Sequence, residues 1–114
     1  MDDEDAVRAR LEEERARTAA RVDALTRDFD EIVEAAQLVS ADDEHDPDGS
    51  TVAFERAQVA ALLLDAQQEL TDIAGAFERL RVGSFGRCER CGRPIRPARL
   101  VARPTATTCV DCAP

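Results

Sequence analysis

The fold is decided by VAFERAQVAALLLDAQQELTDIAGAFERL, residues 52–80. Apolar residues recur in this stretch at alternating steps of three and four, which places them along one side of a helix. The seven-residue repeat continues without interruption, as in the seam of a coiled coil. The nine seam positions are Val52, Arg56, Val59, Leu63, Ala66, Leu70, Ile73, Phe77 and Leu80.

A second stripe, frayed at its start, precedes this one and mirrors it if the chain folds back near residue 46. In that pairing Leu25 faces Ala66 and Phe29 faces Leu63, so the layers can interlock. The sequence therefore predicts an all-α fold, a long antiparallel two-helix coiled-coil hairpin over residues 1–82. Its seam spans about 42 Å by helix rise. The earlier stripe consists of Leu11, Arg15, Thr18, Val22, Leu25, Phe29, Ile32, Ala36 and Val39.

The segment between the stripes, residues 40–51, is acidic and rich in turn-forming residues. We expect it to form the tip of the hairpin, with Ser50 or Thr51 capping the second helix and Gly83 ending it. A simpler interpretation is that this segment is a solvated loop with no binding role. Residues 44–55 also resemble an EF-hand calcium loop, but Glu44 stands where Asp is expected, and calcium-loaded EF-hand helices splay apart.

Charge is divided unequally along the chain, whose net charge is −9. Up to Arg81, nine arginines oppose 22 acidic residues, a net charge of −13; beyond it, six arginines oppose two acids, a net charge of +4. An acidic body disfavours general coating of DNA, because backbone binding needs clustered positive charge. Four Phe and no Tyr or Trp leave little material for a thick globular core.

The N-terminus contains no signal-peptide pattern, and no apolar run approaches the roughly 18 residues of a membrane span. We therefore expect a cytoplasmic protein with no membrane contact. Disulfides rarely persist in the cytoplasm, so the four cysteines need another explanation.

The cysteines form two Cys-x-x-Cys pairs separated by seventeen residues, Cys88 with Cys91 and Cys109 with Cys112. This spacing fits one tetrahedral four-thiolate zinc site, whose closed shell is structural. Gly92 permits the knuckle turn, and Ile95, Leu100 and Val101 supply a small apolar patch. A thioredoxin-like redox pair would need an alternating strand and helix pattern that is absent, and an iron–sulfur cluster is a weaker alternative.

The stretch FGRCERCGRPIRPARLVARPTATTCVDC, residues 85–112, resembles the C4-type zinc finger of the DksA/TraR family. That family carries an antiparallel helical hairpin before its finger, so the expected domains are the hairpin, 1–82, and the zinc finger, 83–114. The matching positions are Phe85, Gly86, Cys88, Cys91, Gly92, Ile95, Arg99, Leu100, Ala102, Pro104, Cys109 and Cys112.

The resemblance implies a bacterial transcription regulator that binds RNA polymerase directly, without recognising a DNA sequence. In such proteins an acidic coiled-coil tip enters the secondary channel of polymerase and modulates initiation. Here the candidate tip residues are Asp43, Asp46 and Asp48, although the last stands where the family's tip has Ala. The chain ends two residues after Cys112, so we expect it to lack the C-terminal helix of longer members, which takes part in their response to ppGpp.

Two alternatives remain open from the sequence. The first is a nucleic-acid-binding zinc ribbon with a coiled-coil interaction arm, which would bind through the arginines of the finger. The second is a scaffold protein that dimerises through its coiled coil, whereas we expect a monomer. No triad, phosphate loop or open metal site supports an enzyme. The arginines in question are Arg87, Arg90, Arg93, Arg96, Arg99 and Arg103.

Overall fold

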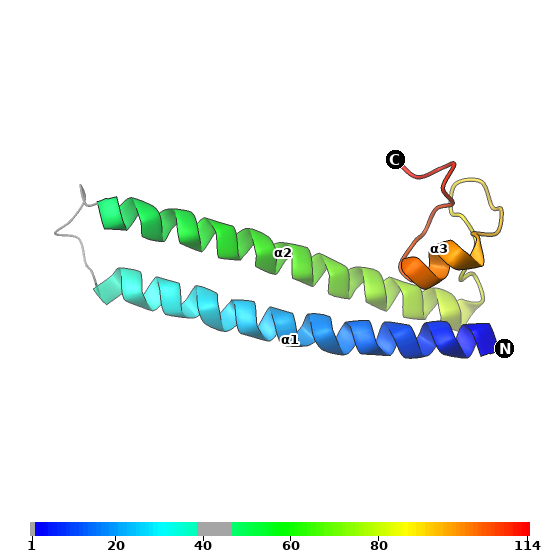
Figure 1. The fold of residues 1–114 in the computed structure, drawn as a ribbon, viewed down its shortest axis with the longest axis horizontal. Coiled ribbons are helices and arrows are strands. Elements are labelled where there is room, and N and C mark those ends of the chain that lie inside the picture. Colours follow the sequence, from blue (N-terminus) through cyan, green and yellow to red (C-terminus); the bar gives the residue numbers. More distant parts are fainter. Residues whose placement is uncertain (1, 39–46) are drawn as a thin grey trace. The chain divides into compact units, whose positions relative to one another are not determined.

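The computed structural model of the chain describes residues 2–38 and 47–114 (Figure 1). Within those residues the helices are α1 (Asp2–Leu38), α2 (Pro47–Val82) and the short α3 (Pro97–Ala102). The described residues contain no strand beyond one isolated bridge between Arg87 and Pro94. None of their helices has the length and apolarity that crossing a membrane would require. The predicted all-α fold, two long packed helices followed by a four-cysteine module, is confirmed.

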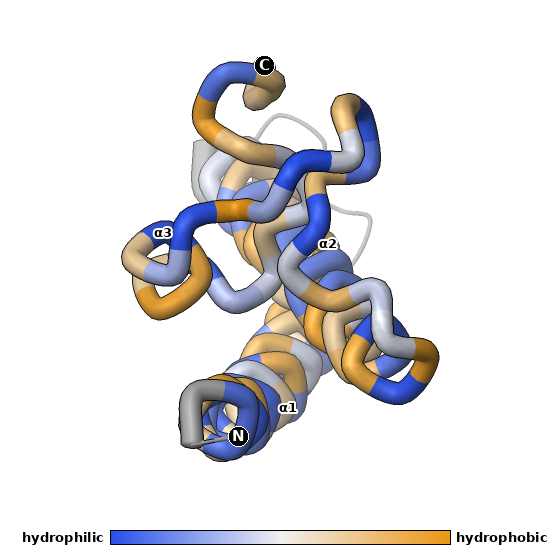
Figure 2. The backbone as a smooth tube through the Cα atoms, turned by 90° about the vertical axis from the view of Figure 1, so that its right-hand side faces the viewer, coloured by the Kyte–Doolittle hydropathy of each residue, from blue (hydrophilic) through white to orange (hydrophobic). Residues whose placement is uncertain are grey.

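The chain forms two compact units, which we call the finger unit (Met1–Arg17 with Glu69–Pro114) and the hairpin unit (Thr18–Gln68). Within each unit, segments of α1 and α2 run in opposite directions beside each other (Figure 1). Both helices change between hydrophobic and hydrophilic residues within single turns, as Figure 2 shows by colour. Each helix therefore has an apolar side to bury against the other.

The predicted seam accounts for the burial in the hairpin unit. Its apolar seam positions are buried or half-buried, whereas Arg56 is exposed, as expected for a long side chain that carries its charged head outward. The two most deeply buried seam residues of this unit are Ala66 and the polar Thr18. Val39, the last predicted position of the first stripe, lies outside the described residues. The other buried and half-buried positions are Val22, Leu25, Phe29, Ile32, Ala36, Val52, Val59 and Leu63.

In the finger unit the seam closes into a small core. Leu11 and Ile73 are fully buried and cluster with Ala76 and Leu80, against which Phe77 and Phe85 pack. The guanidinium of Arg15 lies 4.6 Å from the centroid of the Phe77 ring, a cation–π contact in the predicted layer. Leu11 and Leu80 likewise share the cluster, as the mirrored pairing predicts.

The start of α2 differs from the prediction. The cap expected at Ser50 or Thr51 is wrong, because α2 begins at Pro47. Proline suits the first turn of a helix, since its φ is preset and the missing N–H has no intrahelical partner there. Residues 47–55 are therefore helical, which excludes the EF-hand loop over residues 44–55, because that loop needs a sharp turn at its sixth position.

The end of α2 agrees with the prediction. Gly83 adopts a positive φ of 83°, a conformation in which glycine has no steric penalty. The next residue, Ser84, donates its N–H to the carbonyl of Arg79 at 3.0 Å, which is the long bond of a Schellman cap. Phe85 donates to the same carbonyl at 3.2 Å. This cap turns the chain from α2 into the cysteine module.

The buried core of the finger unit can be tested with Ile73→Ala. Because Ile73 is fully buried, we expect the free energy of unfolding to fall by about 3 kcal/mol, from lost transfer energy and the cavity left behind. Urea unfolding followed by circular dichroism measures the change. The matched control Leu64→Ala removes a side chain that is 67% exposed and should cost less than about 0.5 kcal/mol. Equal effects of the two changes would contradict the burial of this seam.

Candidate metal centre and neighbouring apolar cleft

Cys88 and Cys91 lie on a tight loop that is closed by backbone hydrogen bonds. The N–H of Cys88 donates to the carbonyl of Arg93 at 2.9 Å, and the N–H of Gly92 donates to the carbonyl of Cys88 at 2.9 Å. Gly92 has a φ of 73°, as the predicted knuckle turn requires. Ile95, only 3% exposed, donates its N–H to Gly86 at 2.7 Å and completes the loop.

Cys109 and Cys112 lie on a second tight turn near the C-terminal end. The N–H groups of Cys112 and Ala113 both donate to the carbonyl of Cys109, at 3.2 and 2.9 Å. One backbone bond joins the two turns directly, from the N–H of Glu89 to the carbonyl of Thr107 at 2.8 Å. The sequence separates these pairs by seventeen residues, and the fold brings them together.

The four sulfur atoms form a compact cluster. All four Sγ atoms lie within 4.8 Å of one another, and those of Cys91 and Cys109 are 3.8 Å apart. Four thiolates arranged tetrahedrally around zinc, with Zn–S bonds near 2.3 Å, stand about 3.8 Å from one another. The geometry therefore fits a four-sulfur zinc site built from the predicted cysteines, with no ligand position left for a substrate.

The surroundings of Cys88 and Cys112 shift the pKa values of these two thiols in opposite directions. Backbone N–H groups, first that of Cys109 and then that of Cys91, lower the pKa of Cys88 to about 6. The neighbouring thiol groups, Cys109 foremost, raise the pKa of Cys112 to about 12. Four thiolates so close together repel one another, so full ionisation needs a compensating cation. A divalent soft-ligand ion such as zinc supplies that charge.

Two arginines attach the second turn to the rest of the finger unit. Arg99, on α3, donates through Nε to the carbonyl of Thr108 at 2.9 Å. Arg79, near the end of α2, donates through a terminal guanidinium nitrogen to the carbonyl of Thr105 at 3.4 Å. Arg99 belongs to the sequence pattern, but nothing in the sequence distinguishes Arg79 from other arginines on α2. Its role depends on a contact between residues 26 positions apart.

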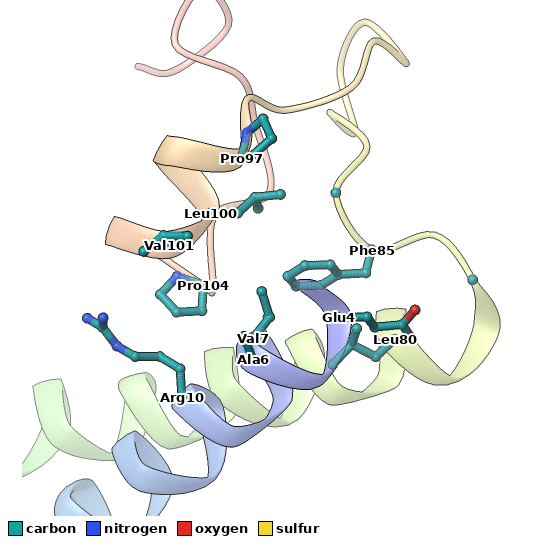
Figure 3. A pocket seen from close by; sticks show the side chains of 12 residues that line it. Glu4, Ala6, Val7, Arg10, Leu80, Phe85, Pro97, Leu100, Val101 and Pro104 are labelled. Carbon is teal, nitrogen blue, oxygen red and sulfur yellow. The ribbon is translucent and has the colours of Figure 1, made fainter. Parts of the chain in front are cut away.

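The finger unit also contains an apolar cleft of about 430 Å³, which residues of α1, the end of α2 and α3 line. Figure 3 shows Val7 of α1, Phe85 and Leu100 pointing toward one another across it. Of the predicted apolar patch, Leu100 and Val101 line this cleft, while Ile95 is buried outside the lining. The cleft is also lined by Glu4, Ala6, Arg10, Leu80, Gly83, Gly86, Pro97 and Pro104.

The predicted partner-binding acids cannot be placed in the same way. Asp43 and Asp46 lie outside the described residues, and Asp48 falls in the first turn of α2. Their role at the tip stays a prediction. The boundary between hairpin and finger also stays a prediction, although α2 ends at Val82, immediately before the cysteine module.

Comparisons with known proteins agree with this geometry. Residues 83–114 match the family model described as prokaryotic dksA/traR C4-type zinc finger. Together with the four clustered sulfurs, this match establishes one structural zinc ion as the cofactor. The RNA polymerase-binding transcription factor DksA of Caulobacter vibrioides is 50% identical over 48 residues, which cover 41% of this chain and 34% of that protein.

Similarity also extends beyond the finger. An uncharacterized protein of Bacillus subtilis, YteA, is 38% identical over 73 residues, which cover 64% of this chain and 30% of that protein. The solved structure of transcription factor DksA2 from Pseudomonas aeruginosa superposes with a TM-score of 0.81 and 27% identity. That superposition covers 97% of this chain and 80% of the other. The chain spans less than half the length of the first curated relatives that it matches.

Removal of a sulfur tests the zinc site. We expect native mass spectrometry to find one zinc ion per chain and to lose it in Cys88→Ser and Cys109→Ser, because three thiolates no longer close the shell. Val110→Ser is the matched control, since Val110 lies between the second pair and is 65% exposed. Zinc affinity should fall as the pH is lowered, because protons compete for the thiolates. Retention of zinc in both cysteine variants would contradict the assignment.

The left-handed backbone of the knuckle gives a second test. Gly92→Ala should lower stability by about 1 kcal/mol, because alanine resists a φ of 73° although its Cβ would meet no neighbouring atom. Gly75→Ala makes the same change inside α2, where alanine favours the helix by up to about 1 kcal/mol. Its new Cβ would lie 3.3 Å from the flexible end of Arg79. In thermal unfolding of the zinc-loaded protein, the midpoint temperature should therefore fall for Gly92→Ala and rise for Gly75→Ala.

Proposed function

We propose that this chain, which belongs to the DksA/TraR C4-type zinc finger family, binds bacterial RNA polymerase directly. One copy would insert the end of its hairpin into the secondary channel and modulate initiation. The family is one of transcription factors and not a class of enzymes. The observation that carries the proposal is the likeness to DksA2 over 97% of the chain, which includes the hairpin as well as the finger.

The charge of the hairpin unit supports insertion of an acidic end. The segment expected at the tip contributes Asp43, Asp46 and Asp48, and exposed acids continue along the adjoining part of α1. Carboxylates are the ligands that a polymerase-bound Mg²⁺ ion prefers. Long-range attraction to positive charge around a channel would also speed the encounter. The acidic tip would therefore act near the catalytic centre of polymerase.

The finger has a different part in this proposal. Its zinc is structural, and it would hold the two cysteine turns as a rigid docking surface on the rim of the channel. Arg87, Arg90, Arg93, Arg96 and Arg103 are exposed and give that surface a positive charge. Recognition of a DNA sequence is not needed, because the promoter is already held by polymerase.

A pull-down of core RNA polymerase with the zinc-loaded chain tests the proposal. We expect wild type to retain polymerase. We expect Asp43→Asn, Asp46→Asn and Asp48→Asn combined to alter open-complex lifetime in single-round transcription by at least about tenfold, a change of about 1.4 kcal/mol in the barrier. The matched control changes three exposed acids near the start of α1, Asp5→Asn, Glu12→Gln and Glu13→Gln, with the same loss of charge. It should leave initiation near the wild-type rate.

The outcomes separate the two parts of this proposal. If wild type does not retain polymerase, direct binding is wrong. If polymerase is retained but the tip variant and the control behave alike, binding stands and the tip assignment is wrong.

The exposed arginines also favour a second candidate, a nucleic-acid-binding zinc ribbon. Arg93, Arg96 and Arg99 line a cavity of about 260 Å³ on the finger, although Asp111 lines it too. The contact of Arg99 with Thr108 gives that side chain a structural role. A salt-sensitive shift of naked DNA that polymerase does not affect would favour this candidate over the first.

A further inference from the structure

One face of α2 in the hairpin unit has no partner among the described residues. Phe54 is 72% exposed, Leu64 is 67% exposed, and Ala57 and Ala61 between them are exposed as well. These four residues, which we call the outer face, follow one another at steps of three, four and three. That spacing is the start of a second coiled-coil stripe. Single exposed apolar residues are ordinary on protein surfaces, and what distinguishes these four is that they share one side of the helix.

The outer face lies on the side of α2 opposite the seam. With 3.6 residues per turn, its mean direction is rotated by about 160° from that of the seam positions between Val52 and Ala66. The seam positions of this segment are half-buried or buried, apart from Arg56. Residues 52–66 of α2 are therefore apolar on two sides, and α1 covers only one of them.

The outer face is complementary to itself in the antiparallel direction. Phe54 and Leu64 each lie five positions from residue 59, and Ala57 and Ala61 each lie two positions from it. A twofold axis at residue 59 would therefore place Phe54 against Leu64 and Ala57 against Ala61 of a second copy. Such an interface uses the same patch on both copies and closes on itself. The small central residues would let the helices approach to about 8 Å.

The residues that flank the outer face do not oppose this pairing. Ala53, Gln58 and Ala60 carry no charge. Asp65, the charged flanking residue, would face the uncharged Thr51 of the second copy. In a chain with a net charge of −9, this neutral patch is where two copies can meet without juxtaposing acids.

We propose that the outer face is a self-association surface, through which α2 pairs with α2 of a second copy in antiparallel orientation. The face is small beside the roughly 800 Å² per partner of a stable interface, so the pair forms at high protein concentration and dissociates readily. Salt should strengthen it, because screening reduces the repulsion between two acidic chains. If the proposed function holds, pairing and insertion exclude each other, because a paired hairpin presents four helices instead of two to the channel.

Sedimentation equilibrium of the zinc-loaded chain, from about 5 μM to about 500 μM, measures the association. We expect a monomer–dimer equilibrium that Ala61→Glu weakens by at least about tenfold, because it places a charge against Ala57 of the second copy. Ala24→Glu is the matched control, since it makes the same change at an exposed position of α1 in the same unit. It should leave the dissociation constant within about twofold.

The orientation of the pair has its own test. Residue 61 faces residue 57 in the antiparallel pair, so Ala61→Glu mixed with Ala57→Arg should form a tighter heterodimer than Ala61→Glu mixed with Ala61→Arg. A parallel pair would bring like-numbered residues together and reverse that order. Native mass spectrometry of the two mixtures distinguishes them by mass.

Three results would overturn the proposal: a wild-type chain that stays monomeric up to about 500 μM, equal weakening by Ala61→Glu and Ala24→Glu, or preference for the mixture expected of a parallel pair. If the chain stays monomeric and Ala61→Glu instead reduces polymerase retention, the outer face belongs to polymerase. Because self-association is measured without polymerase, its failure leaves the proposed function untouched.

Discussion

The burial of a narrow seam between α1 and α2 is the constraint on which the other features depend. Helices of 37 and 36 residues with one apolar stripe each gain little from intrinsic propensity alone and are stabilised mainly by burying that stripe. In the finger unit the seam ends in Leu11, Ile73 and Leu80. Phe85 packs on the same cluster immediately after the Gly83 cap. The seam therefore fixes where the cysteine module starts.

The cysteine module depends on a different interaction, because it has little apolar material of its own. Its buried residues are Cys88, Ile95 and Pro104, far fewer than a module of this length would need to form a hydrophobic core. Backbone bonds such as that from Glu89 to Thr107 hold the two turns in register. The bond energy of four zinc–sulfur contacts then supplies what the missing core cannot. The fold of the cysteine module therefore depends on the metal site. Loss of the ion should destabilise the two cysteine turns before it affects α1 and α2.

The helical seam and the zinc ligands could be predicted because both are local and periodic. A seven-residue repeat determines which side of a helix is buried, and a Cys-x-x-Cys pair brings two ligands onto one turn. The start of α2 was predicted less accurately than the seam and the ligands. Pro47 and Gly49 are compatible both with a reverse turn and with the first turn of a helix. Arg79 was missed for another reason. Its contact with Thr105 is set by tertiary packing, which leaves no spacing signal in the chain.

The two apolar sides of α2 explain how one helix can serve two interactions. The seam side is buried or half-buried against α1 at every apolar position of the predicted stripe. The outer side is short, has alanines at its centre and ends with Phe54 and Leu64, so any partner gains only a small area. A surface of that size gives a reversible contact, and the fraction of chains that are paired depends on the protein concentration. Under the proposed pairing, weak pairs would release single hairpins as the concentration of the chain falls.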